Sequence, residues 1–189
     1  DVYLGMDIIE HAFNFLTENG KASADKSVDE LKKALTDYAL PKNVAGLERD
    51  LLKYRIKYDN WFRESTLHNN GAVKEIIEKL KSSGYTYELD GALWFKSSEL
   101  GDEKDRVLVK QDKSYTYFMP DIAYHMDKLN RGYDKLIDVF GADHHGYVSR
   151  LKASVTMLGQ DADKLSVLLI QMVRAIKNGE EYKISKRTG

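Results

Sequence analysis

The sequence of 189 residues contains no cysteine. Disulfide bonds and thiolate metal sites are therefore excluded, and the composition is consistent with a cytoplasmic protein. Long apolar runs are missing as well: the longest covers residues 167–170, far below the roughly 20 residues that cross a bilayer. No basic segment followed by an apolar stretch opens the chain. We therefore expect neither secretion nor a place in a membrane.

An excess of either charge is also missing, because 29 basic and 30 acidic residues leave a formal net charge of −1. Proteins that bind nucleic acid mainly through its phosphates usually carry a clear basic excess. A role with RNA must therefore be argued from motifs. The chain begins without methionine and stops directly after a lysine-rich segment, so we expect it to be part of a longer protein.

Residues 1–54 have the apolar periodicity of helices. We expect one helix that ends at Gly20. A second should begin with the capping box formed by Ser27 and Glu30 and end at Pro41. A third is expected after residue 43. These helices predict a packed layer that carries no chemistry of its own.

Residues 55–115 are predicted to form a strand, a helix that ends at Gly84, and a small β-rich insert. Asp90 and Gly91 form a strong two-residue hairpin signal. The charged loop at 99–106 is expected to be exposed. The expected strands are residues 55–63, 85–89, 92–95, 107–110 and 115–118.

Residues 116–189 alternate between helices and apolar strands. A helix should start near Pro120 and end at Gly132, and a second should end at Gly159. Buried parallel strands are expected at 136–140 and 167–173. Strand, helix and strand at this spacing predict a βαβ unit of an α/β fold.

The loop after the first of these strands is the first candidate site, because ligands of open parallel sheets bind beyond the carboxyl ends of the strands. Gly141 allows a close backbone approach to a ligand, and Asp143 can accept hydrogen bonds from a ribose. His144 and His145 offer donors beside a helix N-terminus. The alternative is that Asp143 only caps the helix and the histidines are ordinary surface groups.

The lysine-rich segment is the second candidate site. Lys183 and Lys186 flank Ser185, and two mobile lysines can neutralise a triphosphate as pyrophosphate departs. The alternative is a solvated basic tail.

Tyr117 and Asp121 form the third candidate site. They are four residues apart at a helix start and can face one cavity. A carboxylate beside an aromatic ring suits a guanidinium, which pairs bidentately and stacks. The alternative is that Asp121 only favours the helix dipole, with Tyr117 in the core.

These motifs, in this order, closely resemble bacterial arginyl-tRNA synthetases, which are class I enzymes. The lysine-rich segment is similar to the second class I signature, although Ile184 replaces its methionine and Arg187 its last serine. The first signature, His-x-Gly-His, has no counterpart in the sequence. The resemblance covers residues 55–189, and more loosely the opening segment. The phrases that carry it are residues 59–62, 117–125, 141–147 and 183–189.

The resemblance implies the second half of a split dinucleotide-type (Rossmann) fold with parallel strands, plus a helical segment at 1–54 and a β-rich insert at 55–115. It also implies ATP-dependent activation of L-arginine with Mg²⁺, and ligation of the arginine to the 3′ end of tRNA(Arg). The missing signature half is expected before Asp1 and an anticodon-binding domain after Gly189, so the chain alone should be inactive. No resident metal and no particular oligomeric state is predicted.

The resemblance assigns roles to the candidate residues by motif. Lys183, Ser185 and Lys186 would be catalytic. Tyr117, Asp121 and His145 would bind arginine. The ATP site would be formed by Gly141, Asp143, His144, Lys183 and Lys186.

Two other interpretations remain open. Asp121, His125, His144 and His145 could hold zinc or manganese for hydrolysis, which would leave the lysine-rich segment without a role. The other is an interaction module made of helices and β-structure, which predicts no effect of nucleotides. An upstream His-x-Gly-His after an apolar strand would favour the synthetase.

Overall fold

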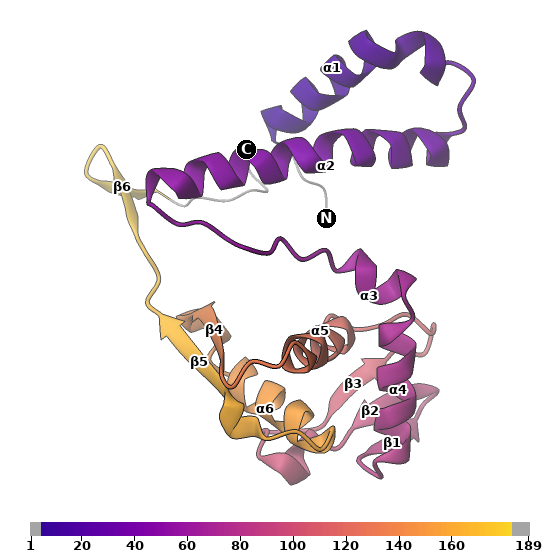
Figure 1. Ribbon diagram of the computed structural model, residues 1–189, viewed down its shortest axis with the longest axis vertical. Helices are drawn as coiled ribbons and strands as arrows, with labels where there is room; N and C mark the ends of the chain where they lie inside the picture. Colours follow the sequence, from indigo (N-terminus) through magenta and orange to yellow (C-terminus); the bar gives the residue numbers. More distant parts are fainter. Residues whose placement is uncertain (1–4, 183–189) are drawn as a thin grey trace. The chain divides into compact units, whose positions relative to one another are not determined.

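The computed structural model describes residues 5–182 (Figure 1). They form two compact units: one contains the described residues up to Trp61 and from Arg174 onward, and the other is Phe62–Val173. The sequence predicted three segments, 1–54, 55–115 and 116–189. The two units do not test this division, which stays a prediction. No helix of the described residues is long and apolar enough to cross a bilayer.

The first unit contains the helices α1 (Met6–Ser23) and α2 (Val28–Lys53) and a two-stranded hairpin of β6 (Ala175–Lys177) and β7 (Glu180–Tyr182). The predicted capping box is confirmed: the Ser27 amide donates to Glu30 Oε2 at 2.8 Å, and the Glu30 amide donates to Ser27 Oγ at 3.4 Å.

The predicted helix ends in this unit are wrong. α1 continues past Gly20, and α2 runs through Pro41, so the second and third predicted helices are one. Proline removes one backbone hydrogen bond, and the alanines, leucines and lysines on both sides favour helix strongly enough to carry it. The packed layer is not confirmed either, because α2 has no buried residue and Phe15 is the only buried apolar side chain of α1.

The predicted strand at 55–63 is also wrong. The structure has a turn followed by irregular chain there, and Arg55 adopts a positive φ of 60°. The aromatic residues instead make ring contacts within each unit. Tyr58 packs edge-on against Trp61 within the first unit, and Phe62 stacks on Tyr124 within the second.

The second unit begins with α3 (Ser65–Asn69), α4 (Ala72–Ser82) and an antiparallel sheet of β1 (Thr86–Leu89), β2 (Ala92–Phe95) and β3 (Arg106–Val109). The predicted hairpin is confirmed, with positive φ at Asp90 and Gly91 as a primed turn requires. The predicted strand at 115–118 is reduced to one bridge at Tyr115, because the next residues start α5 (Phe118–Asn130). A core forms where α4, α5 and the sheet meet, around Leu80, Phe95, Leu108, Met119 and Ile122.

The predicted βαβ unit is confirmed. β4 (Leu136–Gly141) and β5 (Leu165–Ile170) are parallel neighbours, joined through α6 (Tyr147–Met157) and the short 3-10 helices η2 (Ala142–His144) and η3 (Ala162–Lys164). The strands are only partly buried, which corrects the expectation of buried strands: Ile137 and Val139 of β4 are exposed in the described chain, and so is the second half of β5. The fold is thus a mixed α/β arrangement with one parallel pair and antiparallel sheets.

Candidate functional site

Asp121 lies in the first turn of α5 with its carboxylate fixed in place. Its Oδ2 accepts a hydrogen bond from the Tyr147 hydroxyl at 2.7 Å. Its Oδ1 lies 3.3 Å from His125 Nδ1, and the side chain keeps 27% of its surface exposed. The alternative in which Asp121 serves only the helix dipole is therefore too simple, because two side chains from α5 and α6 orient it. The remaining exposure leaves the carboxylate accessible to a cation.

His125 is buried one turn further along α5. Its Nδ1 donates to the Asp121 backbone carbonyl at 2.8 Å, and Nε2 donates to Asp138 Oδ2 at 2.6 Å. Lys128 donates to the other Asp138 oxygen, also at 2.6 Å. Burial alone lowers the pKa of His125, but the interactions with Asp121 and Asp138 outweigh it and raise the pKa from 6.5 to about 9. The two cations His125 and Lys128 therefore lie beside the two carboxylates of Asp121 and Asp138.

Replacing Asp138 by asparagine should lower the pKa of His125 from its value of about 9, because burial and the nearby Lys128 are then opposed by Asp121 alone. In the unchanged protein His125 contributes stability that is full below about pH 6.5 and is lost as pH rises through about 9. A histidine NMR titration of the full-length protein measures the shift. Asp134→Asn, at an exposed position on the loop before β4, is the control. An unchanged titration in Asp138→Asn would contradict the assignment.

Tyr147 was not singled out from the sequence. It starts α6, directly after the strand-end loop, and its ring packs edge-on against Phe118 at 5.8 Å. Burial first, and then the Asp121 carboxylate, raise the pKa of its hydroxyl well above the ordinary range. The hydroxyl therefore stays protonated at neutral pH and donates to Asp121. Tyr147 ends the motif at 141–147 that carries the resemblance, but nothing in the sequence gave it a role toward Asp121.

Tyr117 precedes α5 and its ring is 96% exposed in the described chain. The alternative that placed this tyrosine in the core is therefore wrong. The structure does not bring Tyr117 and Asp121 into direct contact with each other. Their shared role toward a guanidinium stays a prediction.

The strand-end loop places Gly141 and Asp143 against each other. A Cβ at Gly141 would lie 2.5 Å from Asp143 Oδ1, so the glycine lets the carboxylate fold back over the end of β4. Asp143 does not cap α6, because Gly146 holds that position without a side-chain cap. His144 lies 3.7 Å from Asp143, and His145 is exposed. Both histidines and the carboxylate face solvent beside a helix start, where an anion binds favourably.

The metal-site interpretation does not fit the geometry. The four side chains it needs, Asp121, His125, His144 and His145, lie within the described residues, where no three histidines or carboxylates gather in a metal-binding arrangement. Both ring nitrogens of His125 are already engaged within the protein. The described residues therefore do not form the metal site that the hydrolase interpretation needs.

The lysine-rich segment lies outside the described residues. Lys183, Ser185 and Lys186 all follow Tyr182, the last residue that the structure describes.

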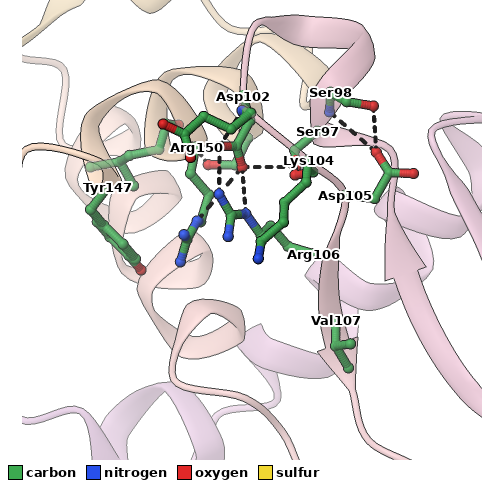
Figure 2. Close-up of polar contacts among 12 residues, drawn as sticks. Ser97, Ser98, Asp102, Lys104, Asp105, Arg106, Val107, Tyr147 and Arg150 are labelled. Atoms are coloured by element: carbon green, nitrogen blue, oxygen red, sulfur yellow. Dashed lines mark hydrogen bonds and ion pairs between the residues drawn. The ribbon is translucent and has the colours of Figure 1, made fainter.

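The charged loop at 99–106 is largely exposed, as expected, but Asp102 is an exception (Figure 2). Its side chain is fully buried and accepts hydrogen bonds from Ser97 and from Nε and Nη2 of Arg106, at 2.7–2.9 Å. Burial raises the pKa of this carboxyl, but the bonds from Arg106 and Ser97 outweigh it and hold the pKa below its usual range. Arg150 of α6 approaches the same carboxylate, with Nε 3.6 Å from Oδ2.

The β4–α6–β5 unit places its polar loop beyond the carboxyl end of β4, where α/β proteins commonly bind ligands. Residues 6–189 match the family described as tRNA synthetases class I (R), catalytic domain. The arginine–tRNA ligase of Staphylococcus epidermidis is 48% identical over the whole chain, and arginine–tRNA ligase 1 of Halalkalibacterium halodurans 47%. The chain spans about one third of the length of these curated relatives (34%).

Solved structures agree with this match. A crystal structure from Campylobacter jejuni, assigned as an arginyl-tRNA synthetase, is 38% identical with a TM-score of 0.84, covering 97% of this chain and 40% of that one. The Thermus thermophilus arginyl-tRNA synthetase is 18% identical with a TM-score of 0.62 over 81% of this chain and 33% of that one, and shares the fold. The chain therefore belongs to the family of class I arginyl-tRNA synthetase catalytic domains, as the motif resemblance predicted.

Proposed function

We propose that the protein containing this chain activates L-arginine with ATP and transfers it to the 3′ end of tRNA(Arg). Family membership over residues 6–189 supports the reaction class. The observation that carries the choice of amino acid is the carboxylate of Asp121, which Tyr147 fixes and which remains partly exposed. A fixed, accessible carboxylate suits the planar, bidentate guanidinium of arginine. By the same proposal, β4, α6 and β5 belong to the second half of a dinucleotide-type fold.

In the first step the arginine carboxylate attacks the α-phosphate of ATP, forming arginyl-adenylate and releasing pyrophosphate. In the second step the terminal hydroxyl of the tRNA attacks the arginyl carbonyl, the bond to the adenylate phosphate breaks, and AMP leaves with the hydroxyl proton released. No side chain needs to act as a nucleophile, so the protein contributes positioning and charge stabilisation. Mg²⁺ enters with the ATP as part of the substrate, because it commonly binds through phosphates and waters with few protein ligands.

The proposal assigns the residues as follows. Asp121 pairs with the guanidinium, with Tyr117 and His145 beside the substrate. Gly141 lets the Asp143 carboxylate lie against the backbone at the end of β4, where Asp143 accepts from the ribose and His144 donates to a phosphate. Lys183, Ser185 and Lys186 follow the triphosphate and stabilise the departing pyrophosphate.

Arginine-dependent exchange of pyrophosphate into ATP by the full-length protein, with tRNA(Arg) present, tests the proposal. Lysine, which offers only a point charge to Asp121, should support far less exchange than arginine. Exchange that does not depend on the amino acid supplied would contradict the choice of substrate.

We expect the 189-residue chain by itself to form no arginyl-tRNA. No two of its histidines have the His-x-Gly-His spacing, so the first class I signature is absent from its nucleotide site. An aminoacylation assay with the purified chain measures this, with the full-length protein as the positive control. Arginyl-tRNA formation by the chain alone would show that the missing signature is dispensable.

A further inference from the structure

Arg150 joins two parts of the second unit that are distant in sequence. On one side its Nε lies 3.6 Å from Oδ2 of the buried Asp102. On the other side its guanidinium lies 5.0 Å from the centre of the Tyr147 ring, one turn earlier on α6. Figure 2 shows Asp102, Arg150 and Tyr147 gathered at this point. The loop between η1 (Ser97–Leu100) and β3 is thereby connected to the tyrosine that holds Asp121.

Arg150 is not needed to neutralise Asp102. That carboxylate already accepts from Ser97, from two guanidinium nitrogens of Arg106 and from the backbone amide of Glu103. The buried Nε of Arg150 has no hydrogen-bond partner among the described residues. A buried donor without a partner costs free energy. Another interaction of the Arg150 side chain must therefore offset this cost.

The cation–π contact between Arg150 and the Tyr147 ring is that interaction. A guanidinium over an aromatic face attracts the ring and fixes its orientation, and Arg150 does so while Phe118 packs edge-on against the same ring. The hydroxyl of the ring so held donates to Asp121 at 2.7 Å. The Arg150 charge also opposes the rise in the pKa of Tyr147 that burial and Asp121 cause, which makes the hydroxyl a stronger donor.

We propose that Arg150 is a positioning residue for arginine binding: anchored by Asp102, it orients Tyr147, whose hydroxyl sets the carboxylate of Asp121 for the guanidinium of the substrate. The inference rests on the proposed function, which assigns Asp121 to arginine. It gives the β-rich insert a part in substrate selection, because the insert supplies the anchor of the chain of contacts.

The test is a double-mutant cycle in the full-length protein, read as KM for arginine and for ATP in pyrophosphate exchange with tRNA(Arg) present. Tyr147→Phe removes one hydroxyl and should raise the KM for arginine about tenfold, the loss expected for one hydrogen bond to a charged group. Arg150→Met removes the charge and should raise the KM for arginine about fivefold. The KM for ATP should stay unchanged in both variants.

The decisive measurement is the combined variant. Because Arg150 acts through the tyrosine hydroxyl, Arg150→Met should add no further rise in the KM for arginine once Tyr147→Phe is present. Arg150→Lys, which keeps a cation over the ring, should restore most of the arginine affinity. Arg131→Met is the matched control, because Arg131 also lies over two rings, those of Phe62 and Tyr124, and should leave both constants unchanged.

Independent effects of Arg150→Met and Tyr147→Phe on the KM for arginine would overturn the inference. An equal rise in the KM for arginine and in the KM for ATP would overturn it too. If Arg150→Met does not fold, Arg150→Gln, which keeps a polar side chain but removes the charge, takes its place in the cycle with the same requirement, that its effect on the KM for arginine disappears beside Tyr147→Phe. Absence of arginine-dependent exchange in the unchanged protein would instead refute the proposed function, so the two failures are distinguishable.

Discussion

Replacing Asp121 by asparagine in the full-length protein should lower kcat/KM for arginine by about two to four decades. The asparagine carbonyl can still accept from the Tyr147 hydroxyl, so the amino group replaces Oδ1, and the negative charge and one acceptor are lost to the guanidinium. A buried cation deprived of its partner costs about 3–5 kcal/mol, and each 1.36 kcal/mol is tenfold in rate. Pyrophosphate exchange at varied arginine concentration measures the loss.

Citrulline separates substrate recognition from damage to the helix. It is a neutral near-isostere of arginine, so its much lower activity should fall little in Asp121→Asn, or rise. Asp127→Asn is the matched control, because this carboxylate on the same helix pairs with Arg131 at the surface and should leave kcat/KM unchanged. Equal losses for arginine and citrulline would mean that Asp121 supports α5 and does not bind the substrate.

Structure that depends on neighbouring residues was predictable from the sequence. The capping box of Ser27 and Glu30, the hairpin at Asp90 and Gly91, and the buried face of α4 each follow from groups within a few positions of one another. The parallel unit was predictable for a related reason, because apolar strands around an amphipathic helix have few other ways to pack.

Structure that depends on competition with the rest of the chain was not predictable. Proline usually ends a helix, yet α2 contains Pro41, because the flanking helix formers outweigh one lost hydrogen bond. Alternating aromatic residues at 55–63 indicate a strand only if a partner strand exists, and no described strand pairs with them. The sequence showed that Pro41 opposes a helix and that residues 55–63 favour a strand. It did not show how strongly the rest of the chain opposes each tendency.

The candidate site also contains residues that neighbouring residues identify and residues that only the folded chain reveals. Asp121 was identified because Pro120 and the helix start mark it locally, whereas its partner Tyr147 lies 26 residues away. Asp102 was taken for part of a solvated charge run, since Arg106 and Ser97 reveal its burial only once the chain has folded around it. A single sequence shows which chemical groups are present but not which distant groups meet.

The lysine-rich segment carries the other large expected effect. Lys186 occupies the second lysine position of the signature, where its charge would meet the pyrophosphate as it departs. Lys186→Ala in the full-length protein should lower kcat by about a hundredfold or more and change the KM for arginine little, the pattern of an interaction made only in the transition state. Steady-state pyrophosphate exchange with tRNA(Arg) present gives both constants. Lys164→Ala, which removes an exposed lysine from η3, should change neither. A loss confined to KM would place Lys186 in ground-state binding and leave the stabilisation of pyrophosphate to other groups.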